Sequence, residues 1–214
     1  MPAELFQLGK YYLWQMLSEE YHFNQKELSL AANAEIMLTK NEMINKVVNR
    51  LAEIAEMLKL AYTQSGIHKN ESVVLSPKIS RGEQYKGLPY VMLDFPRIFS
   101  KNDVLAIRTM WWWGNGFTVM LHLKGKYLQE AVPKLLKKFN GLKQQYISIT
   151  TDEWDHAIAE PGFIPIGQVS EIEFSALLQQ RQFIKLATKF KFSEWNNSQQ
   201  LIADTFITYL QLIE

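Results

Sequence analysis

Cysteine is absent from the 214 residues of the chain. Its absence excludes disulfide bonds, thiolate catalysis and metal sites with cysteine ligands. A chain without cysteine is compatible with a reducing compartment. We therefore expect a cytoplasmic protein.

Long apolar runs are absent as well. No stretch of the sequence approaches the ~20 apolar residues that a membrane-spanning helix needs. The first ten residues, MPAELFQLGK, carry an acidic residue where a secretory signal carries basic ones. These features predict a soluble chain with no membrane partner.

An excess of charge of one sign is also missing. The chain has 23 Lys and Arg against 22 Asp and Glu, and its pI is about 7.8. No global field attracts polyanions, so we expect no nucleic-acid partner. Two groups of lysines are expected to form ordinary solvated faces: Lys134, Lys137 and Lys138, and Lys185, Lys189 and Lys191.

Motifs of cofactor and metal sites are lacking. The sequence contains no GxGxxG, GxxxxGK[ST] or GxSxG pattern, and its four histidines form neither HxH nor HExxH. Asp152, Asp155 and His156 would share one side of a helix, but acidic residues are typical of a helix N-terminus. A metal site there would need a distant further ligand. We expect neither a cofactor nor a metal.

Material for a large core is abundant. Apolar residues make up 47% of the chain and aromatic residues 13%. We expect a single α+β domain over residues 1–214. It comprises an N-terminal helical segment (1–66), an antiparallel meander (71–124) and a mixed helix and strand region (126–214).

The clearest predicted element is a long amphipathic helix over residues 34–63. Two adjacent apolar stripes recur at intervals of three and four, and Ser65-Gly66 ends the pattern. The two stripes are wider than a dimeric coiled coil needs, which favours packing on the domain or in a bundle. Self-association through this helix remains an alternative use of the same surface. A shorter helix is predicted near residues 4–20.

The meander follows from alternating apolar segments and turn residues. Strands are predicted over 90–95, 104–113 and 117–123, with an edge strand over 73–79 that Pro77 interrupts. Residues 81–84 and 100–103 are predicted turns.

The last third of the chain is predicted to mix helices and strands. A helix is expected over 126–140, regular from about Glu130 because of Pro133. Short strands are expected over 146–150 and 183–192. Thr150 with Glu153 and Ser170 with Glu173 have the spacing of capping boxes, and helices are expected after the second, through about Gln180, and after Asn197. The whole is a mostly antiparallel sheet of five or six strands covered by helices on both faces.

Three consecutive tryptophans precede the turn Gly114-Asn115-Gly116. Because side chains of successive strand residues alternate, Trp111 and Trp113 share one face and Trp112 lies on the other. A two-residue Asn-Gly turn, which we prefer, would place Trp111 opposite Met120 on the face that holds His122. A three-residue loop would instead place Arg108 opposite His122. The Trp111 and Trp113 face could line a ligand pocket or be plain core, and plain core is favoured.

Charged residues interrupt two apolar strands. Asp94 lies inside the strand 90–95 and Arg108 inside the next one, and Arg97 follows just after Pro96. A charge in a buried strand needs a partner, so Asp94 is expected to pair with Arg97 or Arg108. The pair is either structural, which is favoured, or part of an anion site in which Asp94 orients an arginine.

Residues 87–99 and 106–115 together resemble an uncharacterised bacterial protein family with a similar hairpin. The resemblance covers about a quarter of the chain. No activity is assigned to that family, so the resemblance implies no residue role.

Three classes of function fit these observations. The first is a non-enzymatic interaction or scaffold protein, a homo-oligomer that self-associates through the 34–63 helix. The second is a module that binds a small apolar or anionic ligand with Trp111, Trp113, His122 and the two arginines. The third is an enzyme with a site near Asp94, Arg97, Arg108 and His122. Because the sequence lacks catalytic motifs, an enzyme is the least favoured of the three classes.

Overall fold

The computed structural model describes residues 21–65, 76–158 and 161–214. The chain divides into two compact units, Met1–Met43 and Ile44–Glu214. We describe each by itself. The helix predicted near 4–20 and the first residues of the predicted edge strand lie outside the described residues.

The described part of the first unit is helical and exposed. Helix α2 (Gln25–Ala31) starts at a capping box, in which Asn24 Oδ1 accepts the Glu27 N–H at 3.0 Å and Glu27 Oε2 accepts the Asn24 N–H at 2.7 Å. Asn33 Oδ1 accepts the N–H of Glu35 at 3.1 Å, next to the start of α3. None of the described residues of this unit is buried.

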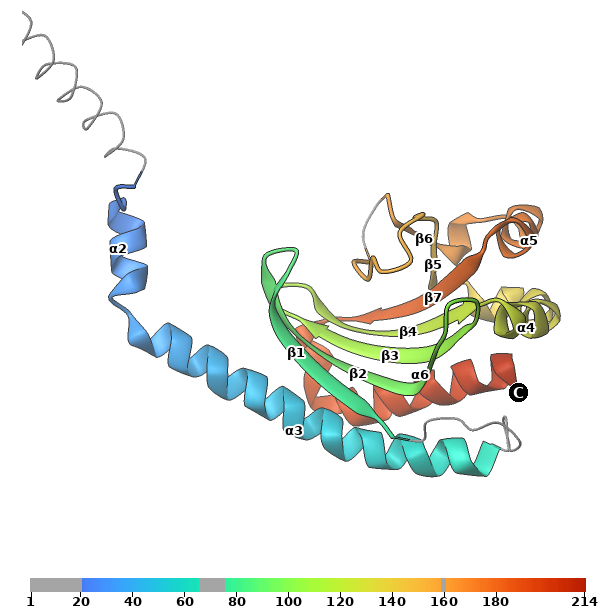
Figure 1. The fold of residues 1–214 in the computed structure, drawn as a ribbon, viewed down its shortest axis with the longest axis horizontal. Coiled ribbons are helices and arrows are strands. Elements are labelled where there is room, and N and C mark those ends of the chain that lie inside the picture. Colours follow the sequence, from blue (N-terminus) through green and yellow to red (C-terminus); the bar gives the residue numbers. More distant parts are fainter. Residues whose placement is uncertain (1–20, 66–75, 159–160) are drawn as a thin grey trace, which may run out of the picture. The chain divides into compact units, whose positions relative to one another are not determined.

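Helix α3 (Ala34–Ser65) confirms the long predicted helix and its end at Ser65 (Figure 1). Its buried side chains follow a single stripe that begins at Ile44. They are Ile44, Val47, Leu51, Ile54, Ala55, Leu58 and Tyr62. The buried face thus contains Val47 and Ile54 of the second predicted stripe, whereas Ile36, Met43 and Met57 of that stripe are exposed.

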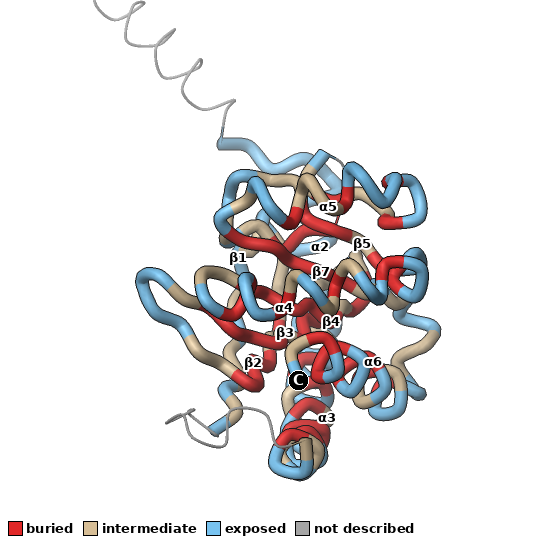
Figure 2. The backbone as a smooth tube through the Cα atoms, turned by 90° about the vertical axis from the view of Figure 1, so that its right-hand side faces the viewer, coloured by how far each residue is buried: buried red, intermediate tan, exposed pale blue. Residues whose placement is uncertain are grey.

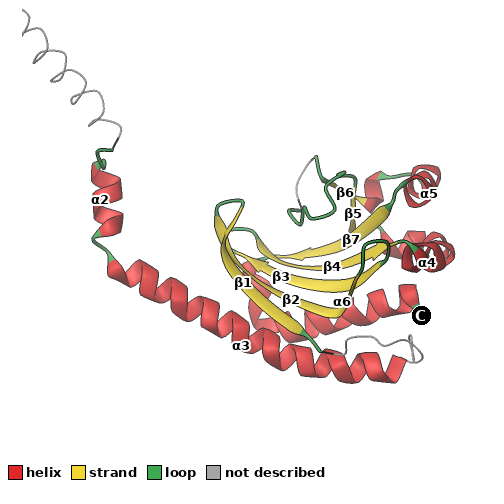
Figure 3. Cartoon of the chain, in the orientation of Figure 1, coloured by secondary structure: helices red, strands yellow, loops and turns green. Residues whose placement is uncertain are grey.

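The second unit is built on one antiparallel sheet of seven strands, whereas the sequence predicted five or six (Figure 3). The strands follow the order β1-β2-β3-β4-β7-β5-β6. Their bounds are β1 (Lys78–Tyr85), β2 (Leu88–Phe99), β3 (Val104–Trp112), β4 (Gly116–Lys124), β5 (Tyr146–Ser148), β6 (Phe163–Pro165) and β7 (Phe183–Phe190). The predicted four-stranded meander, β1 to β4, is confirmed.

The helices gather on one face of this sheet rather than on both. Odd-numbered strand residues such as Leu93, Ile107 and Leu121 share one large core with α3, α4 (Lys126–Lys137), α5 (Glu171–Gln180) and α6 (Ser198–Ile213). Figure 2 shows the buried residues along the strands and the inner sides of the helices. Ile158 and Phe163 pack on part of the other face, together with Met110 and Met120.

Three local differences from the sequence predictions have physical causes. β1 runs through residues 81–84, where we expected a turn, because Gly82 pairs with Tyr90 of β2. β2 continues past Pro96, which follows a cis peptide bond, by shifting register between Asp94 and Arg97. α4 contains Pro133 in its interior. Burial of side chains on the opposite side of the helix, including Ala131 and Leu135, offsets the main-chain hydrogen bond that proline cannot donate.

Of the two predicted capping boxes, one is formed and the other is not. Ser170 and Glu173 form one and open α5, as predicted. Thr150 and Glu153 do not, because Thr150 Oγ1 accepts the Asp152 N–H at 3.0 Å in a local turn instead. Residues 149–158 therefore form a loop. Asn197 stands before α6 without a side-chain cap hydrogen bond.

The preferred hairpin register is wrong. Trp111 pairs with Phe117 and Arg108 with Met120, so β4 is displaced by three residues from the Asn-Gly alignment. The last pair before the turn is Trp112 with Gly116, so residues 113–115 form the turn. The Asn115 N–H donates to the Trp112 carbonyl at 3.0 Å, and Gly114 has φ +73°. Because three is odd, the faces exchange: Trp112, not Trp111, shares a face with Met120 and His122.

Gly116 is a critical turn residue. It has φ +94°, and a Cβ there would overlap the carbonyl oxygen of Phe190. Gly114 also has positive φ, but a Cβ there would meet nothing. We expect Gly116→Ala to cost about 3 kcal/mol or more and Gly114→Ala about 1–2 kcal/mol, because only the first adds a main-chain clash to backbone strain. Urea denaturation measures both, and equal losses would contradict this account of the turn.

Candidate functional site

Four ionisable side chains lie side by side on the sheet face opposite the helices. Asp94, Arg108, His122 and Lys185 come from four adjacent strands, β2, β3, β4 and β7. Pairing places Asp94 across from Arg108 and His122 across from Lys185. The loop 149–158 adds Glu153 and His156. We call these six residues the sheet-face cluster.

Asp94 and Arg108 form the ion pair that the sequence predicted as one of two choices. Arg108 Nε donates to Asp94 Oδ1 at 2.6 Å, and the second guanidinium nitrogen donates to Oδ2 at 2.9 Å. The two side chains are 12% and 8% exposed, so this is a buried two-point contact. Arg97 takes no part, since its Nε donates to the carbonyl of Ser76 at 2.9 Å.

His156 completes this chain of contacts. Arg108 Nη1 lies within hydrogen-bond distance of His156 Nε2. A guanidinium can only donate, so Nε2 must accept and the ring hydrogen of neutral His156 must sit on Nδ1. Burial, together with the charges of Arg108 and Lys185, lowers the pKa of His156 to about 2. The ring is therefore neutral, and its Nδ1 has no partner among the described residues.

His122 is held neutral in the same way. Burial and the nearby charges of Lys185 and Arg108 lower its pKa to about 3. Its Nε2 lies 3.3 Å from Glu153 Oε1, but the geometry does not meet hydrogen-bond criteria. The firm partner of Glu153 is Lys124, whose Nζ donates to Oε2 at 2.7 Å.

Lys185 is the member that sequence reasoning missed. We expected a solvated lysine, but its side chain is 1% exposed. Its Nζ donates to the carbonyl of Glu153 at 2.8 Å and to that of Asp155, and so fastens the loop 149–158 to β7. Burial lowers its pKa to about 8. The only signal was its two-residue spacing from apolar Phe183 and Ala187, which places all three on one strand face.

Tyr85 and Asp155 close the outer side of the loop. Tyr85 donates its hydroxyl hydrogen to Asp155 Oδ1 at 3.0 Å and accepts the His156 N–H at 2.7 Å. Burial, with Asp155 adding to it, raises the pKa of Tyr85 to about 12. Lys86 Nζ lies 3.1 Å from the same Asp155 oxygen. The loop is thereby bonded at both sides of the sheet-face cluster.

Trp111 and Trp113 lie apart from this cluster. Trp111 is 3% exposed and its ring contacts those of Trp113 and Phe192, at centroid distances of 5.7 and 5.2 Å. Trp111 belongs to the helix-side core, and Trp113 packs against that core. The structure thus brings together Asp94, Arg108 and His122 of the predicted site residues, and it separates them from Arg97 and both tryptophans.

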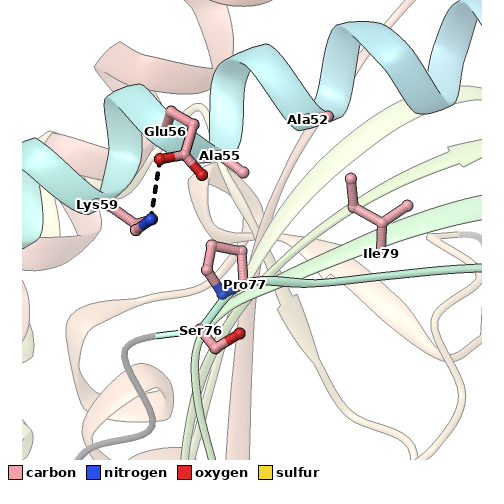
Figure 4. Close-up of a pocket in the computed structure, with 7 residues that line it drawn as sticks. All are labelled: Ala52, Ala55, Glu56, Lys59, Ser76, Pro77 and Ile79. Carbon is pink, nitrogen blue, oxygen red and sulfur yellow. Dashed lines mark hydrogen bonds and ion pairs between the residues drawn. The ribbon is translucent and has the colours of Figure 1, made fainter.

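Two open grooves lie outside the cluster. The first, of about 600 Å³, runs between α3 and the start of β1 (Figure 4). Its lining residues are Ala52, Ala55, Glu56, Lys59, Ser76, Pro77 and Ile79. Its charged residues, Glu56 and Lys59, pair with each other at 2.9 Å. The second, of about 450 Å³, lies between the β3–β4 turn and the end of β7.

No family model, curated protein or solved structure matches the chain. The resemblance to a bacterial family therefore stays a prediction. Within the described ranges, no helix combines the length and apolar character that crossing a bilayer requires. Across those same ranges, no group of three or more His, Cys, Asp or Glu side chains could hold a metal ion.

Proposed function

We propose that this protein is a non-enzymatic interaction protein that self-associates through the helical segment 21–43. The observation that carries the proposal is the exposure of this segment. Its exposed apolar side chains are Tyr21, Phe23, Leu28, Leu30, Ile36, Met37, Leu38 and Met43, from 40% to 75% exposed. Large apolar side chains exposed in such numbers are typical of protein interaction sites.

Helix energetics support the same conclusion. α2 has only seven residues and none is buried. So short a helix is marginal in water without packing against a partner. Within the predicted contact helix 34–63 the buried residues begin at Ile44, so we assign the proposed contact to the part before Ile44.

A second copy of the chain fits this surface. Residues 21–43 contain two lysines and three glutamates, so two such segments meet with little net repulsion. Ile36 and Met43 lie two helical turns apart, on one side of α3. They provide an apolar strip that a symmetric partner can match.

The enzyme alternative has less support. The charged groups of the sheet-face cluster are bonded to one another and to the loop that lies over them. Such an arrangement stabilises a fold and leaves little surface for a substrate.

Light scattering of the full chain tests the proposal. We expect particles that are multiples of 25.0 kDa at micromolar concentration. We expect Ile36→Gln/Met43→Gln to weaken association at least about tenfold, because both apolar contacts are lost while helix propensity is kept. Ile172→Gln is the matched control, since this side chain is 83% exposed on α5. A strictly monomeric wild type, or equal effects of the two variants, would overturn it.

A further inference from the structure

The groove beside the β3–β4 turn carries charge without compensation. Its lining residues are Gly114, Asn115, Gly116, Tyr146, Lys189, Phe190, Lys191 and Phe192. Among the described residues that line it, none is acidic, and neither Lys189 nor Lys191 forms an ion pair. Both lysine side chains belong to exposed residues. The nearest acid in sequence, Glu194, accepts the main-chain N–H of Lys191 at 2.7 Å and is not part of the lining.

The walls of this groove are aromatic. Tyr146 and Phe190 are partly buried, and Phe192 is 38% exposed. The groove volume of about 450 Å³ falls within the range of small-molecule sites. Aromatic walls beside two cations match a ligand with a flat apolar body and a negative group.

Two buried polar atoms without a partner line a small cavity that shares residues with the groove. A small enclosed cavity, about 10 Å³, shares Asn115, Gly116 and Lys189 with the groove. His156 and Thr118 also line it. Both His156 Nδ1 and Thr118 Oγ1 are buried and lack a partner among the described residues, and His156 is 6% exposed.

The cavity has room for one water molecule, which would bond both atoms. His156 can only donate at this side, because Arg108 fixes its ring hydrogen on Nδ1. Since its pKa is about 2, this donor stays unchanged through the physiological pH range. The small cavity next to the groove therefore holds an uncharged donor, while the groove itself is lined by two lysines.

We propose that this groove binds a small organic anion. Lys189 and Lys191 hold the negative group, and Tyr146 and Phe192 contact an aromatic or flat apolar body. This site is independent of the proposed self-association and lies in the other unit of the chain. It also differs from the Trp111 and Trp113 face, which the sequence offered as an alternative ligand pocket.

Amide NMR shifts of the full chain titrated with benzoate test the proposal. We expect saturable shifts at residues 114–116 and 189–192. Benzyl alcohol, the uncharged analogue, and acetate, which lacks the ring, should each bind at least about tenfold more weakly. Equal binding of benzoate and benzyl alcohol would overturn the cationic site, and equal binding of acetate would overturn the aromatic contact.

The variant Lys189→Met/Lys191→Met removes the two cations from exposed positions and should still fold. We expect about a tenfold or greater loss of benzoate affinity. Lys137→Met/Lys138→Met removes the same charge from exposed residues at the end of α4 and should leave affinity unchanged. Equal losses in both variants would show a global charge effect and overturn the site, as would an absence of shifts in the wild type.

Discussion

Replacing Asp94 by Leu should lower the free energy of unfolding by about 3–5 kcal/mol, because Arg108 is then left buried without its counter-charge. The pair makes two hydrogen bonds at 2.6 and 2.9 Å. Replacing both residues, Asp94→Leu with Arg108→Met, should cost less than the sum of the single changes by about 2 kcal/mol or more. Urea denaturation of the four proteins gives this coupling energy.

A second double-mutant cycle, on an exposed ion pair, provides the control for the effect of burial. Glu56 and Lys59 form an ion pair at 2.9 Å on α3, where their side chains are 71% and 38% exposed. Their coupling, measured with Glu56→Leu and Lys59→Met, should be about 0–1 kcal/mol. A coupling no larger for Asp94 and Arg108 would mean that burial adds nothing to this contact.

Stability should fall steeply as the pH drops from 6.5 to about 4. In the unfolded chain His122 and His156 titrate near pH 6.5, whereas their folded pKa values are about 3 and about 2. The unfolded state therefore binds more protons across this window, and acid favours unfolding. Each histidine contributes about 1.4 kcal/mol per pH unit, so two together cost roughly 5 kcal/mol over about two units. Above pH 6.5 their contribution is fully present.

The slope of unfolding free energy against pH, rather than its level, is the quantity to measure. His122→Gln/His156→Gln should flatten this slope, and each single variant should remove about half of the change. If the double variant keeps the slope of the wild type, carboxylates alone account for acid unfolding.

The sequence was sufficient for elements with local causes. The long helix followed from its apolar repeat and its end, and the meander followed from alternation between turns. α5 followed from the capping box of Ser170 and Glu173. The Asp94 and Arg108 pair was predictable because buried charges require partners.

The rest depended on long-range contacts. Thr150 and Glu153 have the spacing of a capping box, but Glu153 bonds Lys124 and lies near His122, both on β4. Lys185 resembles a surface lysine until the loop carbonyls that surround it are known. The contacts of the loop 149–158 with Lys124 and Lys185 cannot be predicted from local sequence, because a strand pattern does not indicate what covers each face of the sheet.

The β3–β4 hairpin adopts a register that differs from the one its turn sequence favours. Asn115-Gly116 favours a turn that would send His122 toward the helix-side core and away from Lys185. In the observed register Asp94, Arg108, His122 and Lys185 share one sheet face, and Asp94, Arg108 and Lys185 make hydrogen bonds there. The alignment of β3 with β4 is therefore decided by their neighbours β2 and β7. The local turn preference of Asn115-Gly116 alone would therefore not produce the observed pairing of β3 with β4.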